Sequence, residues 1–154
     1  MSHQTPPEPN AAGREAIDGV EYFRRVMRGE IPPGPMTELL GLRLTEVDRG
    51  RVVLAGTAAE RFYNGLGIAH GGFAATMLDT ALGCAINTLQ PAGRVFTTLE
   101  LKINYTRPLT VASGELRCEA TVLHNGSRTA TAEARITDAQ GRLCAHATTT
   151  CILA

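Results

Sequence analysis

The fold is decided by a stretch near the middle of the chain, residues 70–89, which reads HGGFAATMLDTALGCAINTL. From Gly71 to about Leu89 the residues are apolar or small on nearly every side of a helix, and Asp79 is the only charged one. A helix that is hydrophobic all round is buried and does not lie on the surface. The stretch therefore predicts one long helix at the centre of the molecule.

Strands are predicted on both sides of that helix. Residues 41–59 read as two strands joined by a tight turn at residues 48–50. After the helix, apolar and polar residues alternate, which predicts about four antiparallel strands with turns at 108–114, 124–127 and 138–141. In the first of these strands we expect four residues to face the covered side: Leu99, Leu101, Ile103 and Tyr105. One antiparallel sheet wrapped around one helix buries that helix economically, so the predicted fold class is α+β.

The amino-terminal part divides into a tail and a helix. Residues 1–15 are rich in proline and polar residues, lack the apolar core of a signal peptide, and predict a flexible tail. Residues 16–36 predict a helical extension, with an apolar stripe at Val20, Phe23, Val26 and Met27. The prolines of residues 31–35 are expected to end that helix. Residues 37–154 then form the main domain.

Composition excludes several classes of protein. A chain of 154 residues with 44% hydrophobic and 19% charged residues is typical of one globular domain. Fifteen basic and fifteen acidic side chains give no net charge, which disfavours nucleic-acid binding. The longest uncharged runs, 65–78 and 80–93, are too short and glycine-rich to span a membrane. The four cysteines have no paired spacing, so we expect neither disulfides nor a metal site, and a cytoplasmic location.

The glycines at the start of the central helix are the first candidate for chemistry. Gly71 and Gly72 let a ligand approach the backbone, where unpaired N–H groups and the helix dipole favour negative charge. Those are the requirements of an oxyanion hole. The alternative is a glycine turn that needs a positive φ. A dinucleotide fingerprint is disfavoured, because His70 stands where its third glycine belongs and a meander follows the helix.

Asp79 is the second candidate. The residues three and four positions away on the same helix offer it no cation: Ala75, Thr76, Leu82 and Gly83. An unpaired buried carboxylate is costly, so Asp79 is expected either to reach a cleft or to function. The alternative is a structural hydrogen bond to a nearby strand or a subunit contact.

The separation of these two candidates has a consequence for assembly. Gly71 and Asp79 are eight residues apart, which is about 12 Å along one helix. A carboxylate that attacks a carbonyl held at the helix start must lie within a few ångströms of it. If both groups are catalytic, two antiparallel helices related by a two-fold axis are needed, so that each site takes one group from each chain.

Four motifs in this sequence resemble those of the hotdog-fold acyl-CoA thioesterases, in their PaaI-like (phenylacetate-degradation) branch. The resemblance covers about residue 37 to the end. The motifs are Asn64-x-x-Gly67-x-x-His70-Gly71-Gly72-x6-Asp79, Thr98-x-Glu100-Leu-x-Ile-Asn104-Tyr-x-Arg107-Pro108, His124-x-Gly126-Ser-Arg128 and Asp138-x-x-Gly141-x-Leu143-x-Ala145.

The resemblance implies a hotdog fold that dimerises and often pairs again into a tetramer. It implies hydrolysis of an acyl-CoA without a cofactor, with the Gly71 N–H polarising the thioester carbonyl and His70 supporting that loop. Asp79 of the partner chain would act as general base or nucleophile, and Asn64 would position the attacking group. Thr98 matches a serine or threonine near the carboxylate, with Thr97 as an alternative because strand parity is not fixed.

The resemblance also suggests residues that bind the substrate. Gly72, Phe73 and Met77 are expected near the acyl group, and Arg128 near a CoA phosphate, although a solvated surface arginine is an equal reading of Arg128. Two other functions stay open: a hotdog dehydratase or hydratase, whose histidine is spaced differently, and a non-catalytic acyl-CoA-binding module.

Overall fold

The computed structural model describes residues 17–154, so the tail predicted over residues 1–15 lies outside the described residues. Helices α2 (Gly19–Met27) and α3 (Pro35–Leu39) come first, followed by a hairpin of β1 (Arg43–Asp48) and β2 (Arg51–Thr57). Helix α4 (Gly71–Asn87) leads into four strands: β3 (Phe96–Tyr105), β4 (Glu115–Asn125), β5 (Thr129–Thr137) and β6 (Leu143–Leu153). This is the predicted order of elements.

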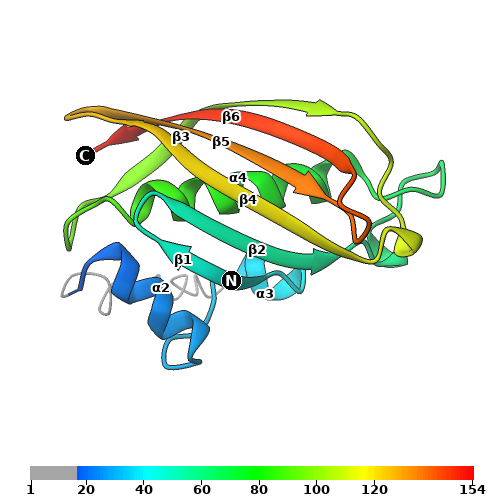
Figure 1. The fold of residues 1–154 in the computed structure, drawn as a ribbon, viewed down its shortest axis with the longest axis horizontal. Coiled ribbons are helices and arrows are strands. Elements are labelled where there is room, and N and C mark those ends of the chain that lie inside the picture. Colours follow the sequence, from blue (N-terminus) through cyan, green and yellow to red (C-terminus); the bar gives the residue numbers. More distant parts are fainter. Residues whose placement is uncertain (1–16) are drawn as a thin grey trace, which may run out of the picture.

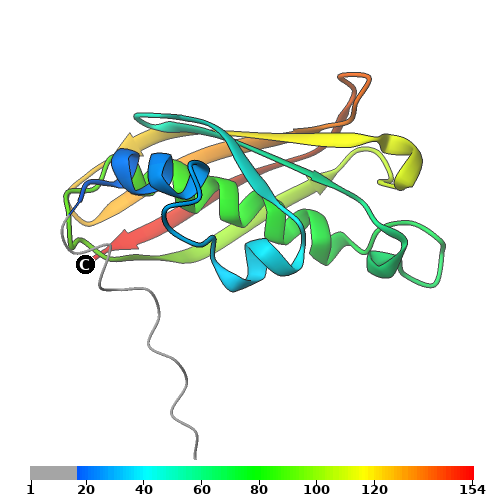
Figure 2. The ribbon, with the colours of Figure 1, turned by 90° about the horizontal axis from the view of Figure 1, so that it is seen from below.

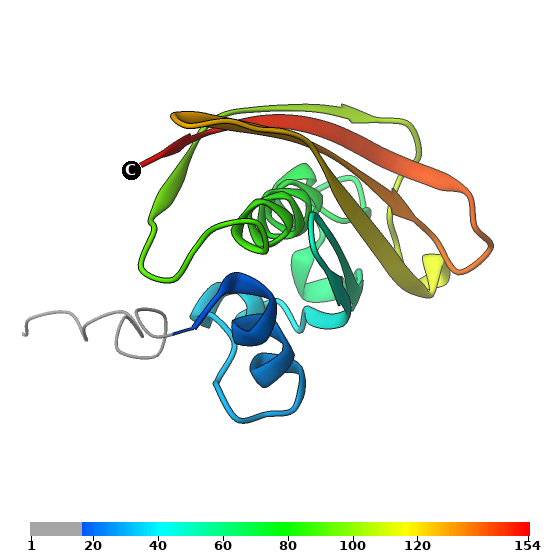
Figure 3. The same cartoon turned by 60° about the vertical axis from the view of Figure 1, so that its left-hand side comes forward.

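One six-stranded sheet forms the main layer. Its strand order is β1-β2-β4-β5-β6-β3, and every neighbouring pair is antiparallel. The sheet curves around α4, which lies against its concave face (Figure 1, Figure 3). The α+β class and the hotdog arrangement expected from the resemblance are therefore confirmed, and β1 and β3 are the two edges of the sheet.

Helix α4 is the centre of the core. Four of its large side chains, Met77, Leu78, Leu82 and Ile86, are fully buried. They pack against inward-facing residues of β2, β4 and β5, and each such burial contributes about 1.5–3 kcal/mol. None of the helices within residues 17–154 is long and apolar enough to cross a membrane. The predicted buried helix is thus confirmed, and it ends at Asn87, two residues before the predicted end.

Strand β3 departs from the predicted alternation. Thr98 pairs with Cys151 and Glu100 pairs with Thr150, so Leu99 is an extra residue in the ladder. Such a bulge shifts which residues face each side of a strand. Leu99 is 58% exposed, and the prediction that it faces the covered side is wrong. The bulge also puts Thr98, and not Thr97, on the inner face with the buried Cys151.

The amino-terminal helix packs against the end of α4 (Figure 2). Gly19 makes this contact, because a Cβ atom there would lie 1.9 Å from the carbonyl oxygen of Asn87. Val20 and Phe23 of the predicted stripe are buried. The helix ends at Met27, before the prolines, so the prediction that they end it is wrong. Its last turn is closed by Gly29 in the left-handed region, with φ +73°.

Candidate active site

The loop before α4 presents Asn64 beside the start of the helix. The Asn64 N–H donates to Ile68 O at 2.8 Å, and Asn64 Oδ1 accepts from the Leu66 N–H at 2.9 Å. Gly67 closes the turn with φ +74°, a conformation that glycine adopts without strain. Nδ2 of Asn64 makes no hydrogen bond to any other residue of the described chain, so this donor can meet a ligand.

His70 accepts hydrogen bonds from two N–H groups of the first helical turn. Its Nδ1 accepts from the Gly72 N–H at 2.9 Å, and its carbonyl oxygen accepts from the Phe73 N–H at 2.9 Å. Because Nδ1 accepts, the neutral ring carries its hydrogen on Nε2. The Gly71 N–H has no acceptor among residues 17–154. His70 thus leaves Gly71 as a free donor at the positive end of the helix dipole.

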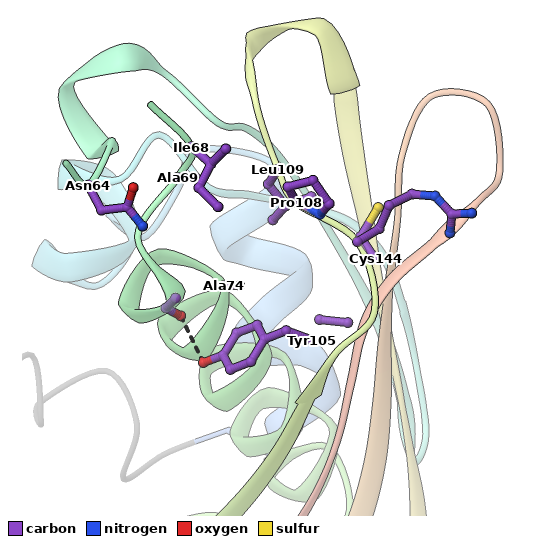
Figure 4. Close-up of a pocket in the computed structure, with 11 residues that line it drawn as sticks. Asn64, Ile68, Ala69, Ala74, Tyr105, Pro108, Leu109 and Cys144 are labelled. Atoms are coloured by element: carbon purple, nitrogen blue, oxygen red, sulfur yellow. Dashed lines mark hydrogen bonds between the residues drawn. The ribbon is translucent and has the colours of Figure 1, made fainter. Parts of the chain in front are cut away.

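A cavity of about 120 Å³ opens beside Gly71 (Figure 4). Its wall is mostly apolar, with Asn64 and Gly71 beside the helix start and Arg107 on the side of β6, where its guanidinium donates to Leu143 O at 3.0 Å. Eleven residues line it: Asn64, Ile68, Ala69, Gly71, Ala74, Tyr105, Arg107, Pro108, Leu109, Cys144 and Ala145. The arrangement suits a small apolar group whose polar end meets hydrogen-bond donors at the start of α4.

Cys144 is the one thiol in this wall, and its surroundings disfavour a nucleophile. It is almost fully buried, and its Sγ donates to Arg142 O at 3.3 Å. Burial raises its pKa, and the nearby negative charge of Asp138 raises the pKa further. Reactive cysteines need the thiolate form, so Cys144 lines the cavity and does not act as a nucleophile. Within residues 17–154 no group of three or more His, Cys, Asp or Glu side chains could hold a metal ion.

Asp79 is half-buried on α4 and is held by strand β3. The Thr98 hydroxyl donates to Asp79 Oδ1 at 3.0 Å, and Cys151 Sγ lies 3.9 Å from the same hydroxyl. Burial raises the pKa of Cys151, so its S–H stays protonated and can donate to Thr98. No hydrogen bond reaches Asp79 Oδ2 from the rest of the described chain. The carboxylate therefore has one anchored oxygen and one free oxygen.

The predicted catalytic residues fall into two clusters. Asn64, His70 and Gly71 lie together at the start of α4, whereas Asp79 and Thr98 lie together two turns along it. One chain does not bring the clusters together, since eight residues of helix separate Gly71 from Asp79 by about 12 Å.

The predicted substrate-binding residues are dispersed. Gly72 is exposed at the helix start. Phe73 is buried and stacks on Phe62 at 4.9 Å between ring centroids, and Met77 is fully buried; neither lines the cavity. Arg128 is exposed in the β4–β5 turn, where its carbonyl oxygen accepts from the Leu153 N–H.

Arg128 lies at the opposite end of α4 from Gly71. Leu153, whose N–H donates to the Arg128 carbonyl, is followed by Ala154. The Ala154 N–H donates to the carbonyl oxygen of Val95, in the segment after α4. The Arg94 guanidinium in that segment also donates to the carbonyl of Ser127. In one chain, Arg128 and the cavity are therefore far apart.

Sequence reasoning missed part of the cavity wall. Tyr105 is the last residue of β3, Leu109 lies in the loop after it, and Cys144 and Ala145 lie near the start of β6. The alternation of β3 did place Tyr105 on the covered side, which was a usable signal. Nothing in the sequence indicates that the start of β6 approaches the start of α4.

Comparison with known proteins identifies similar chains. A family model described as the thioesterase superfamily matches residues 66–145. A Halobacterium salinarum protein, provisionally described as an esterase, is 33% identical over 103 residues, covering 64% of this chain and 66% of that protein. The proofreading thioesterase EntH of Klebsiella pneumoniae is 28% identical over 109 residues, covering 71% of this chain and 78% of EntH.

A solved structure is also similar. It is a provisionally assigned thioesterase from Ralstonia eutropha, described as related to phenylacetic acid degradation. It matches with a TM-score of 0.78 at 29% identity, covering 85% of this chain and 98% of that one. The matched family region includes Gly71, Asp79 and Thr98, while Asn64 lies just before it.

Proposed function

The chain belongs to the thioesterase superfamily, and from that premise we propose that it hydrolyses an acyl-CoA thioester to the free acid and CoA. One observation carries the proposal. His70 occupies the N–H of Gly72 and leaves the N–H of Gly71 free beside a mostly apolar cavity. A free donor at a helix start, next to space for an acyl group, suits a carbonyl that gains negative charge during attack.

The first cluster binds and polarises the thioester. The carbonyl oxygen accepts a hydrogen bond from the Gly71 N–H, which stabilises the oxyanion as the carbonyl carbon becomes tetrahedral. The Nδ2 donor of Asn64 stands at the same cavity and orients the attacking oxygen. The acyl group lies against the apolar wall. Removing one such donor from an oxyanion hole costs about 10²–10³ in kcat in other enzymes.

The second cluster comes from a second copy of the chain. Strand β3 is an edge of the sheet, and edge strands present unpaired N–H and C=O groups that pair readily with another chain. Beside it, α4 carries half-exposed small residues at Ala75, Thr76 and Gly83. Pairing around a two-fold axis near Ala75 brings Asp79 of one chain to Gly71 of the other.

Asp79 supplies the base or the nucleophile. In one route its free Oδ2 takes a proton from water, the water oxygen attacks the carbonyl carbon, and the carbon–sulfur bond breaks as CoA leaves. In the other route Oδ2 attacks the carbonyl carbon, the carbon–sulfur bond breaks and CoA leaves, and water then hydrolyses the resulting anhydride to the free acid and the Asp79 carboxylate. Thr98 holds Oδ1 in both routes, which fixes the direction of the carboxylate.

The same antiparallel pairing would bring Arg128 close to the cavity of the partner chain. The end of α4 in one chain comes close to the loop before α4 in the other, because the helices run in opposite directions. Arg128 and Arg94 then stand outside the partner's cavity, where a CoA phosphate can meet a guanidinium.

The test is CoA release from a panel of acyl-CoAs, followed with a free-thiol reagent, for the wild type and Asp79→Asn. We expect hydrolysis of at least one acyl class and a loss of about 10² or more in the variant. Circular dichroism and the melting temperature confirm that the variant is folded. Wild-type binding without turnover would overturn the proposal in favour of an acyl-CoA-binding module.

A further inference from the structure

Tyr105 touches the residue that carries the free donor. Its hydroxyl donates to Gly71 O at 3.1 Å, from the end of β3 to the start of α4 (Figure 4). The ring also lies directly over Gly71, because a Cβ atom at that position would be 3.2 Å from both Cζ and the hydroxyl oxygen. Such contacts are tighter than ordinary van der Waals packing. The absence of a side chain at Gly71 is what lets the tyrosine approach.

The hydrogen bond acts where a helix is least constrained. The first-turn N–H groups have no partner inside the helix, so the orientation of Gly71 is not fixed by its own N–H. Glycine adds further backbone freedom. Two side chains compensate for this: His70 holds Gly72 through its N–H, and Tyr105 holds Gly71 through its carbonyl oxygen.

We propose that Tyr105 is a positioning residue, which aligns the Gly71 N–H with the thioester carbonyl. Its hydroxyl holds the Gly71 carbonyl oxygen, and its ring packs against the same residue. The inference rests on the proposed hydrolysis and adds a residue to that site. Tyr105 is 55% exposed, so its hydroxyl does little for the core of a single chain. An oxyanion hole requires alignment within a fraction of an ångström, and such alignment depends on supporting contacts.

The first test compares Tyr105→Phe with the wild type. Loss of one hydrogen bond that matters mainly in the transition state is expected to lower kcat by about 2- to 10-fold and to leave KM within about 2-fold. Tyr22→Phe is the matched control, since Tyr22 lies on α2, outside the cavity wall. It is expected to keep the wild-type kcat. A Tyr105→Phe variant with wild-type kcat, whatever its melting temperature, would overturn the inference.

A second test uses the contact between the ring and Gly71. Gly71→Ala pushes its methyl group against the Tyr105 ring, whereas Tyr105→Ala removes that ring. We expect Gly71→Ala to lower kcat less in the Tyr105→Ala background than in the wild type, because coupled residues are not additive. Equal losses in both backgrounds would show that the ring does not hold Gly71, and would overturn the inference.

The wild-type measurement separates the two proposals. If the wild type releases no CoA from any acyl-CoA, the proposed function fails, and the role of Tyr105 in it fails too. If the wild type releases CoA and the Tyr105 variants have the same kcat as the wild type, the proposed hydrolysis stands and the positioning role alone is overturned.

Discussion

Replacing Thr98 by valine tests how Asp79 is held. The change keeps the size and branching of the side chain but removes the hydroxyl that donates to Asp79 Oδ1 at 3.0 Å. A hydrogen bond to a charged group contributes about 1.5–3 kcal/mol. Asp79 is only half-buried, which favours the lower figure and predicts about a 10-fold loss in kcat/KM. The assay is CoA release at several concentrations of the best acyl-CoA, with the melting temperature as the measure of folding.

Thr97→Val is the matched control for that measurement. Thr97 is the neighbouring residue of the same strand, but the bulge at Leu99 leaves it exposed on the other face. We expect this variant to keep the wild-type kcat/KM. Wild-type activity in Thr98→Val, or an equal loss in Thr97→Val, would refute the reasoning that Thr98 anchors the carboxylate.

Two further predictions concern stability. Gly19→Ala would place a Cβ atom 1.9 Å from Asn87 O, so α2 must detach and lose about 3 kcal/mol or more of buried apolar contact, measured by urea unfolding. Gly34→Ala is the control, because its Cβ atom would make only an ordinary contact, with Thr37 Oγ1 at 3.7 Å, and equal stability of the two variants would contradict this packing. For Asp138, burial raises the pKa, but hydrogen bonds from Arg142 and the Gln140 N–H outweigh it and leave the pKa lowered. The stabilisation that Asp138 contributes is therefore present at neutral pH and lost as the pH falls below about 4. The melting temperature of Asp138→Asn should approach that of the wild type only in acid. A difference in melting temperature that does not change with pH would contradict this reasoning.

The fold could be predicted from the sequence where local and global preferences agree. The central helix is apolar on every side, and alternation marked the strands of the second half. The bulge at Leu99 could not be predicted, because the alternation continues through it and only pairing with β6 reveals the extra residue. The contact of Gly19 with Asn87 was also hidden, since a glycine at a helix start has many causes.

The candidate site was predicted unevenly. Gly71 could be singled out, because glycines at a helix start have a clear physical use, whereas the role of His70 came from the family resemblance. Asp79 was noticed because it is the one charge on a buried helix. Tyr105 was assigned to the inner face but not to the site. Its contact with Gly71 depends on how far β3 extends along α4, which is a property of the packed sheet.

Mixed dimers test most directly whether two chains build each site. Asn64→Ala and Asp79→Ala chains carrying different affinity tags are co-expressed, and the mixed dimers are purified through both tags. If Asn64 of one chain works with Asp79 of the other, each mixed dimer has one intact site and one doubly altered site. We then expect about half of the wild-type CoA release per dimer, while either variant alone is nearly inactive. Mixed dimers as inactive as their parents would contradict a site shared between chains.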